Sequence, residues 1–153
     1  MYAVHARAIR ALKDSSYPTD ALEAWAGRAR PEDFRTTDTS RHLVVAEAAT
    51  AAGPCIAGYG RLHVAEGTIE AIYVDPDFAR QGVGGLLVRA LEREGRARGL
   101  PGLIVEASLN SVPFYRALGY VAKGIDHHPL APGVSIDCAV MEKRFGPAAP
   151  VSD

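Results

Sequence analysis

The sequence predicts a single α/β domain with a mixed, mostly antiparallel central sheet and helices on both faces. Two segments with helical spacing of apolar residues come first, within residues 2–26. Residues 42–63 then form two β-rich segments around a turn, the pattern of an antiparallel hairpin. Residues 69–107 run as strand, glycine-rich loop, helix and strand, and a crossover of this kind makes its two strands parallel.

The composition limits the class of protein. A chain of 153 residues with 48% apolar and 23% charged residues fits one packed domain, which we expect at residues 1–145, with a disordered Pro/Ala-rich tail at 146–153. The net charge of −1 offers no basic surface for nucleic acid, and no apolar run approaches the roughly 20 residues of a membrane span. Cys55 and Cys138 form no metal-ligand pair and are typical of a reducing compartment, so we expect a cytoplasmic protein without a metal.

The first half of the chain alternates helix formers with turn residues. A first helix is expected at residues 2–13, which are rich in helix-forming residues. Thr19 is suited to cap a second helix, with Trp25 on its inner face. Residues 30–40 are polar and irregular, which indicates a loop.

The hairpin that follows is expected to pair residues 42–47 with residues 55–63 across a turn at 48–54. Gly58 and Gly60 lie two residues apart, on one face of the return strand. Glycine inside a strand often marks a place where another part of the chain approaches closely. We therefore expect close packing over this face.

The second half of the chain begins with a helix that runs to about Arg98 and ends before Gly99. The strand at 103–107 is apolar, so we expect it to be covered on both faces. The remaining elements are expected to be a short helix at 112–118, a strand at 120–123, a loop at 124–134 and a closing strand at 135–143.

The stretch from Gln81 to Gly85, Gln-Gly-Val-Gly-Gly, leads directly into a helix. A helix N-terminus presents unbonded N–H groups and the positive end of a dipole, so an anion such as a phosphate belongs there. A triphosphate loop would need a lysine after the glycines, and a dinucleotide loop would need glycine where Leu87 stands. On these residues alone, the alternative is a tight turn between strand and helix with no ligand.

Residues 73–84, Tyr-Val-Asp-Pro-Asp-Phe-Ala-Arg-Gln-Gly-Val-Gly, resemble the coenzyme A loop of the GNAT superfamily of N-acetyltransferases. The family pattern is Gln/Arg-x-x-Gly-x-Gly/Ala after a strand. Residues 106–120 are similar to the second half of that family, in which an Asn is followed by Phe-Tyr and then by Gly and an aromatic residue. Residues 18–25 are similar to the second helix of an uncharacterised bacterial branch. Two separated motifs at the right spacing are more specific than either motif alone.

The resemblance implies acetyl-CoA as the cosubstrate. Its pyrophosphate would lie on the amides of residues 81–86, and its pantetheine arm along the strand ending at residues 72–74. This strand would splay from its parallel neighbour at 103–107, and an amine would attack the thioester directly in a ternary complex. The coenzyme-binding residues implied are Ile72, Tyr73, Val74, Ala79, Arg80, Gln81, Gly82, Val83, Gly84, Gly85, Leu86, Asn110 and Tyr115.

Two features depart from the family pattern. Ala79 stands where the first motif position is usually Gln or Arg, so one side-chain contact is missing and Arg80 is the nearest substitute charge. Family members usually have a strand before the first helix, whereas Met1 here leads directly into helix-forming sequence. Either that edge strand is lost or the start has been trimmed. A cradle of backbone amides does not depend on either feature.

The matched motif implies that Tyr115 donates a proton to the departing thiolate. The alternative is a packed aromatic ring whose hydroxyl group finds a backbone partner. Asn110 matches a polar contact to the coenzyme arm and is equally suited to cap the following helix. The backbone N–H of Val74 is placed to serve the acetyl carbonyl.

Two carboxylates are candidates for the base that takes the proton of the amine. Glu70 lies four residues before Val74 on one strand, so the alternation of side chains predicts a shared sheet face and contact through a water. Glu106 lies near the end of a strand that is otherwise apolar, where its pKa could be raised or where it lines the splay. The alternative for each is an ordinary exposed or capped carboxylate.

The acceptor amine, a small molecule or a peptide, is not specified by the sequence. Tyr17 and Trp25 lie in the segment that lines the acceptor pocket in the family, and His127 lies in the loop predicted at its rim. Besides an N-acetyltransferase, the chain could be a coenzyme A-binding regulatory module without activity, or an acyltransferase for longer acyl chains. A homodimer is open, through an exposed strand edge at residues 55–60 or at the last strand.

Overall fold

The computed structural model describes residues 1–12, 16–35 and 37–147, so residues 148–153 of the tail predicted at 146–153 lie outside the described residues. The helices and strands are α1 (Tyr2–Arg10), α2 (Thr19–Ala26), β1 (Arg41–Thr50), β2 (Gly53–His63), β3 (Thr68–Val74), α3 (Val83–Ala97), β4 (Gly102–Ser108), α4 (Val112–Ala117), β5 (Val121–Ala131) and β6 (Val134–Arg144). Short 3-10 turns occupy Pro31–Phe34, Pro76–Phe78 and Leu109–Ser111.

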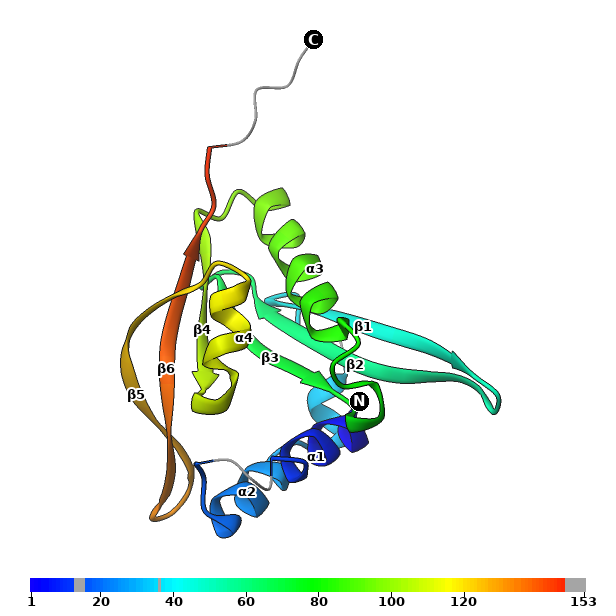
Figure 1. Ribbon diagram of the computed structural model, residues 1–153. Helices are drawn as coiled ribbons and strands as arrows, with labels where there is room; N and C mark the ends of the chain where they lie inside the picture. The colour runs from blue at the N-terminus through cyan, green and yellow to red at the C-terminus, as the bar shows by residue number, and fades with distance from the viewer. Residues whose placement is uncertain (13–15, 36, 148–153) are drawn as a thin grey trace.

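The six strands form one mixed sheet in the order β1-β2-β3-β4-β6-β5 (Figure 1). Every neighbouring pair is antiparallel except β3 and β4, which are parallel. This parallel pair is joined only at Thr68–Ile104 and Ile69–Val105, and beyond these residues the two strands diverge. The predicted mixed sheet and its splayed parallel pair are therefore both confirmed.

Helices cover both faces of the sheet. One face packs against α3 and α4 around a core that includes Leu62, Leu91, Leu103 and Met141. The other face packs against α1 and α2 through two smaller apolar clusters. The predicted close packing at the two glycines of β2 is also found. A Cβ on Gly58 would lie 2.8 Å from the Tyr73 carbonyl oxygen and 3.1 Å from Leu87 of α3.

Several sequence predictions about strands were wrong. The predicted loop at 124–134 is mostly strand, because β5 pairs with β6 from Val121 to Ala131. The predicted turn at 48–54 is tighter, since β1 runs to Thr50 and β2 starts at Gly53. β4 is covered on one face only, and its outward-facing residues Ile104 and Glu106 are exposed.

The predicted free edges also differ. Residues 55–60 belong to β2, which is paired on both sides, and the last strand β6 lies between β4 and β5. The strands at the two ends of the sheet are β1 and β5. Among the described residues, none of the helices is both long and apolar enough to cross a bilayer.

Candidate functional site

The glycine-rich loop is held at the end of β3 by a buried carboxylate. Asp75 follows the strand directly, and its side chain accepts from the Asp77 N–H group at 3.0 Å. Its other oxygen accepts from Arg7 of α1 at 2.9 Å, and Asp77 accepts from the same guanidinium at 3.0 Å. Because Asp75 is only 5% exposed, this contact fixes the first helix against the start of the loop.

The loop ends at Gly82, which precedes α3 and has a φ of 83°. Most residues avoid this left-handed conformation, whereas glycine adopts it readily. Arg80 has a φ of 62° and is a non-glycine residue with positive φ, so the loop turns sharply at two nearby positions. The Leu86 N–H group already donates to the Gly82 carbonyl at 3.1 Å. The free amides of the helix N-terminus therefore end at Gly85, and the prediction that Leu86 supplies one was wrong.

The backbone of β3 presents a second set of unpaired groups. Val74 lies opposite Gly58, and the next residue, Asp75, donates its N–H group to the Ala57 carbonyl at 2.8 Å. Hydrogen bonds alternate along an antiparallel ladder, so the N–H groups of Val74 and Ile72 point away from β2. They point toward β4, which is not paired with β3 at this level.

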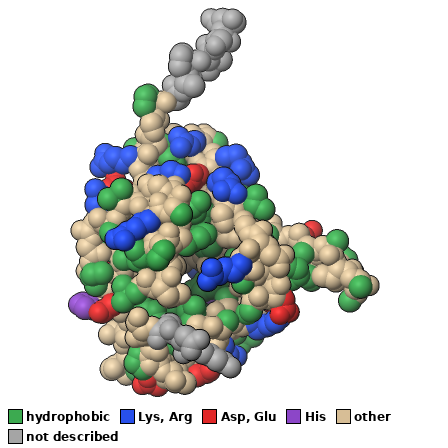
Figure 2. Space-filling view, viewed as in Figure 1, with side chains coloured by type: hydrophobic (Ala, Val, Ile, Leu, Met, Phe, Trp, Pro, Cys, Tyr) green, Lys and Arg blue, Asp and Glu red, His purple; other side chains and the backbone are tan. Residues whose placement is uncertain are grey.

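A groove of about 1000 Å³ runs from the loop into the gap between β3 and β4. We call it the glycine-loop groove. Figure 2 shows the surface hollowed on this face, with hydrophobic side chains inside it and basic side chains beside it. Its lining includes the sequence-predicted residues Ile72, Tyr73, Val74, Ala79, Arg80, Gly82, Val83, Gly84, Gly85, Asn110 and Tyr115.

Two predicted coenzyme contacts, Gln81 and Leu86, do not line the groove. The Gln81 side chain donates to the Asp77 carbonyl at 3.3 Å, and the Leu86 side chain is 58% exposed. Asn110 lines the groove but does not cap a helix, because it lies within the Leu109–Ser111 turn and α4 starts after Ser111. The Asn110 side-chain amide is therefore not used as a helix cap and lies in the wall of the groove.

Tyr115 is the most buried polar residue at the inner end of the glycine-loop groove, being 5% exposed. Its ring packs edge-on against Phe114 and Tyr120. Burial raises the pKa of the Tyr115 hydroxyl group, and the nearby Tyr73 hydroxyl group adds to this effect. The phenol therefore carries its proton at neutral pH, which is the state that a general acid needs.

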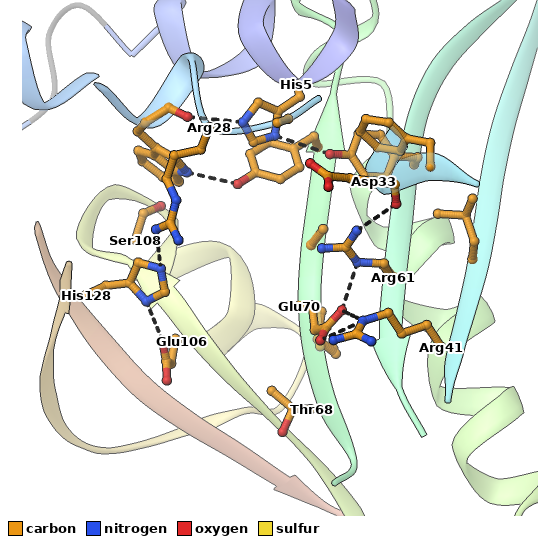
Figure 3. Close-up of a pocket in the computed structure, with 18 of the residues that line it drawn as sticks. His5, Arg28, Asp33, Arg41, Arg61, Thr68, Glu70, Glu106, Ser108 and His128 are labelled. Carbon is orange, nitrogen blue, oxygen red and sulfur yellow. Dashed lines mark hydrogen bonds and ion pairs between the residues drawn. The ribbon is translucent and has the colours of Figure 1, made fainter. Parts of the chain in front are cut away.

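A second cavity of about 830 Å³ lies on the face of the sheet that α1 and α2 cover (Figure 3). We call it the arginine-lined cavity, because Arg28, Arg35, Arg41 and Arg61 all contribute to its wall. The two spaces meet at the splay between β3 and β4. The residues that line both are Trp25, Ile69, Glu70, Ala71, Tyr73, Glu106 and Ser108.

Glu70 lies at this junction, but not for the reason that strand alternation predicted. Arg61 pairs with Ala71 and Leu62 pairs with Ile69, so Glu70 is an extra residue in a β-bulge. Its side chain points into the arginine-lined cavity beside Arg41 and Arg61, and the prediction that it shares a face with Val74 was wrong.

The Glu70 carboxylate is shared between two guanidinium groups. Arg41 Nε donates to Glu70 Oε2 at 2.9 Å. Arg61 Nε lies 2.8 Å from the same oxygen, although the N–H vector is too poorly aligned for a hydrogen bond. Arg41 also contacts Asp38. This network gives the cavity a wall of alternating charge.

Glu106 lies across the junction from Glu70 and is paired with a histidine. His128 Nδ1 lies 3.0 Å from Glu106 Oε2, and Arg28 Nη1 lies 3.0 Å from His128 Nε2. His127, the histidine predicted at the acceptor rim, instead contacts Asp137 at 2.6 Å and does not line the cavity. Side chains alternate along β5, so of the two adjacent histidines in the predicted loop His128 lines the cavity and His127 does not.

Of the two aromatic residues predicted to shape the acceptor site, one lines the cavity and the other does not. Trp25 lines both spaces, and its Nε1 donates to the Tyr73 hydroxyl group at 3.1 Å. Tyr17 is 8% exposed, lines neither space, and donates its hydroxyl hydrogen to the Asp137 carbonyl at 2.6 Å. It therefore holds β6 to the segment before α2.

Several cavity residues that make polar contacts were not singled out from the sequence, among them His5, Arg41 and Arg61. His5 is buried and bridges the Tyr59 hydroxyl group and the Trp25 carbonyl, each at 3.2 Å. No spacing in the sequence links these residues, since they come from α1, β1 and β2. Within the described part of the chain, no three His, Cys, Asp or Glu residues are grouped so that they could hold a metal ion.

The fold and the site define a class of protein first: a mixed α/β protein with a free helix N-terminus, a place that favours an anion, beside two splayed parallel strands. The family model described as the acetyltransferase (GNAT) domain matches residues 13–128. The chain is 32% identical over 122 residues to the uncharacterised N-acetyltransferase YjcF of Bacillus subtilis, a match that covers 78% of this chain and 85% of that protein. The chain belongs to the GNAT family of acetyltransferases, and it is an acyltransferase.

Solved structures agree with this assignment. A GCN5-related N-acetyltransferase from Rhodopseudomonas palustris has a TM-score of 0.82 and 30% identity, and the match covers 94% of this chain and 87% of that chain. PaiA N-acetyltransferase from Thermoplasma acidophilum, solved in complex with coenzyme A, has a TM-score of 0.72 over 94% of this chain and 90% of that chain. Its identity of 14% supports the shared fold alone.

A curated relative with a named substrate is more distant. Thialysine N-epsilon-acetyltransferase of Bos taurus is 27% identical over 127 residues, a match that covers 74% of each chain.

Proposed function

We propose that this protein transfers an acetyl group from acetyl-CoA to a primary amine by direct attack of the amine in a ternary complex. One observation carries the proposal: the glycine-loop groove and the arginine-lined cavity share part of their lining where β3 and β4 splay apart. A thioester entering through the groove and an amine entering through the cavity would meet there, without a covalent enzyme intermediate.

The coenzyme binds in the glycine-loop groove. Its pyrophosphate takes the free amides between Gly82 and Gly85 at the positive end of α3. Its pantetheine arm pairs with the outward-facing backbone groups of Ile72 and Val74, in place of the missing β4 partner. PaiA, which shares this fold, was solved in complex with coenzyme A, and this supports coenzyme A as the ligand. No metal takes part in the proposed reaction.

The chemistry at the junction needs an oxyanion donor and a proton for the thiolate. The Val74 N–H group points into the gap and would donate to the acetyl carbonyl oxygen. Tyr115 lines the inner end of the groove with its proton retained, and would protonate the sulfur as the C–S bond breaks. Asn110 contacts the coenzyme arm.

The proton of the acceptor amine is removed at this junction, which Glu70 and Glu106 both line. The carboxylate of Glu70 already accepts from Arg41 and lies against Arg61, which leaves it little capacity to accept an ammonium proton. Among the described residues, the Glu106 carboxylate has only His128 as a hydrogen-bond partner, so the Glu106–His128 pair is better placed than Glu70 to take the proton.

The acceptor enters the arginine-lined cavity, where Trp25 forms part of the wall. The related proteins named above act on thialysine in one case, and a structural neighbour from Escherichia coli acts on the alanine of ribosomal protein S18. Small molecules and peptides are therefore both reasonable acceptors for this fold.

The test of the proposal is Tyr115→Phe, with Tyr120→Phe as the matched control. Tyr120 is also buried, packs against Tyr115, and has a hydroxyl group without a hydrogen-bond partner in the described structure. We expect acetyl-CoA to raise the melting temperature of all three proteins. Turnover of an amine panel should fall about 100-fold in Tyr115→Phe alone. Intact turnover in Tyr115→Phe would exclude Tyr115 as the acid, and failure of acetyl-CoA to bind the wild type would exclude the function.

A further inference from the structure

Three hydrogen-bonded side chains lie along one wall of the arginine-lined cavity. Figure 3 shows His128 between Glu106 and Arg28. His128 Nδ1 lies 3.0 Å from Glu106 Oε2, and His128 Nε2 lies 3.0 Å from Arg28 Nη1. The three residues come from β5, β4 and the segment after α2. All three line the cavity.

The hydrogen-bond partners determine the tautomer of His128. A guanidinium group can only donate, so Nε2 must be the accepting nitrogen of a neutral ring. Nδ1 then carries the hydrogen and donates it to the Glu106 carboxylate. A histidine held in this way by a carboxylate has its basic nitrogen directed into the cavity, the arrangement of a general base and its orienting group.

Arg28 currently occupies that basic nitrogen. The same guanidinium nitrogen also donates to the Pro129 carbonyl at 2.8 Å. Arg41 and Arg61 both lie against Glu70, whereas no carboxylate pairs with Arg28 among the described residues. Arg28 is therefore an exposed cation on the wall of this cavity, without a carboxylate partner in the part of the chain that the structure describes.

We propose that His128 is the general base toward the acceptor amine, that Glu106 is its positioning residue, and that Arg28 binds a carboxylate carried by the acceptor. This inference rests on the proposed function and names the substrate class: an amine that also carries a carboxylate. When the acceptor's carboxylate forms an ion pair with Arg28, the guanidinium group moves away from His128 Nε2, and the acceptor's ammonium group can then contact this nitrogen.

The protons balance through the whole step. His128 Nε2 takes one proton from the ammonium group, and the resulting amine forms the N–C bond with the thioester carbonyl. The C–S bond then breaks, and the thiolate takes the Tyr115 proton. The nitrogen loses its second proton as the amide forms, and this proton returns to Tyr115. His128 releases its proton to water, so one proton leaves per acetyl group transferred.

The chain contains a matched control for this proposal. His127 is the adjacent residue of the same strand and contacts Asp137 at 2.6 Å, which makes it another carboxylate–histidine pair. It does not line the arginine-lined cavity. If each pair serves only as a surface ion pair, replacing either histidine should have the same effect on kcat. If His128 is the base, only its replacement should lower kcat.

The first experiment compares His128→Ala with His127→Ala, using acetyl-CoA and an amine panel that pairs L-lysine with cadaverine and L-ornithine with putrescine. We expect kcat to fall about 100-fold in His128→Ala, with the affinity for acetyl-CoA unchanged and with partial rescue by added imidazole. His127→Ala should keep the wild-type kcat. An unchanged kcat in His128→Ala, or a loss that imidazole cannot rescue and that His127→Ala shares, would overturn the proposal.

The second experiment tests the two supporting residues. As a single substitution, Glu106→Gln should lower kcat about tenfold. It should have no further effect when His128→Ala is already present, because Glu106 acts through the His128 ring. Arg28→Met should raise KM for the carboxylate-bearing amine of each pair about tenfold and leave KM for its decarboxylated partner unchanged. Additive losses, or an equal rise for both amines, would overturn these roles. Binding of acetyl-CoA without transfer to any amine by the wild type would instead overturn the proposed function itself.

Discussion

The two spaces that meet at the splayed strands are built from different parts of the chain. The glycine-loop groove takes its polar groups chiefly from the backbone: the amides at the start of α3 and the unpaired edge of β3. The arginine-lined cavity takes its polar groups from side chains, with four arginines and five carboxylates in its wall. The groove therefore depends on the path of the chain, and the cavity depends on which residues occupy it.

This difference explains how one fold can keep a cosubstrate while its acceptors differ. A backbone amide is supplied by nearly every residue type, so we expect coenzyme binding in the groove to tolerate side-chain changes, including Ala79 at the usual Gln/Arg position. In the cavity, each substitution changes a charge or an ion pair directly. We expect mutations to separate coenzyme binding from acceptor binding along this division.

Gly82→Val should produce the largest difference between coenzyme binding and acceptor binding, by weakening the binding of acetyl-CoA. Nothing lies within 4 Å of a Cβ added at Gly82, so the effect is conformational rather than steric. A β-branched residue at a φ of 83° costs about 1–2 kcal/mol and would rotate the amides at the start of α3 away from the phosphate. We expect affinity for acetyl-CoA, measured by calorimetry, to fall about tenfold or more.

Gly82→Asn is the control for that change, because asparagine tolerates the left-handed region far better than valine. It should keep most of the affinity for acetyl-CoA. Gln81→Ala should also have little effect, since the Gln81 side chain does not line the groove. Equal losses in Gly82→Asn and Gly82→Val would show that side-chain bulk, not backbone conformation, controls the groove.

The groove could be predicted from the sequence because its parts are local. The strand, loop and helix that form it are consecutive, and the backbone consequences of a glycine-rich helix start follow from general rules. What local reasoning missed was the hydrogen bond from Leu86 to Gly82, which removes one amide from the predicted cradle.

The cavity could not be predicted in the same way, because its residues come from distant elements and two irregularities change their directions. A bulge at Glu70 reverses the alternation on which its predicted face was based. A strand at β5, in place of the predicted loop, turns His128 inward and leaves His127 outside the cavity. Pairing with β6 decides both the existence of β5 and its register, and no local pattern reveals this.

Glu70→Gln should have a smaller effect of the opposite kind, weakening the binding of the acceptor and not that of acetyl-CoA. The carboxylate is 20% exposed and lies against both Arg41 and Arg61, so its loss leaves two cations without their shared anion. We expect the free energy of unfolding to fall by about 1–2 kcal/mol in denaturant titrations. KM for the acceptor should rise several-fold while the affinity for acetyl-CoA stays within twofold of the wild type.

Glu66→Gln provides the comparison, because Glu66 is exposed and lies outside both spaces, 3.8 Å from His63. It should change neither stability nor kinetics measurably. If Glu70→Gln weakens acetyl-CoA as much as the acceptor, the two spaces are not energetically separate.

The smallest effect concerns pH and Asp38, at the entrance of the arginine-lined cavity. The Ser40 hydroxyl group, the Ser40 amide and Arg41 lower the pKa of Asp38 to about 2 from its usual 3.8. Because the folded value is the lower one, the stabilisation is complete above the unfolded value and is lost as the pH falls through the folded value. Asp38→Asn should therefore lower the melting temperature slightly at neutral pH, and its difference from the wild type should shrink between about pH 4 and pH 2. The affinity for acetyl-CoA at neutral pH should not change, because Asp38 lines only the cavity. A difference in melting temperature that stays constant down to pH 2 would mean that the Asp38 carboxylate is not held by these contacts.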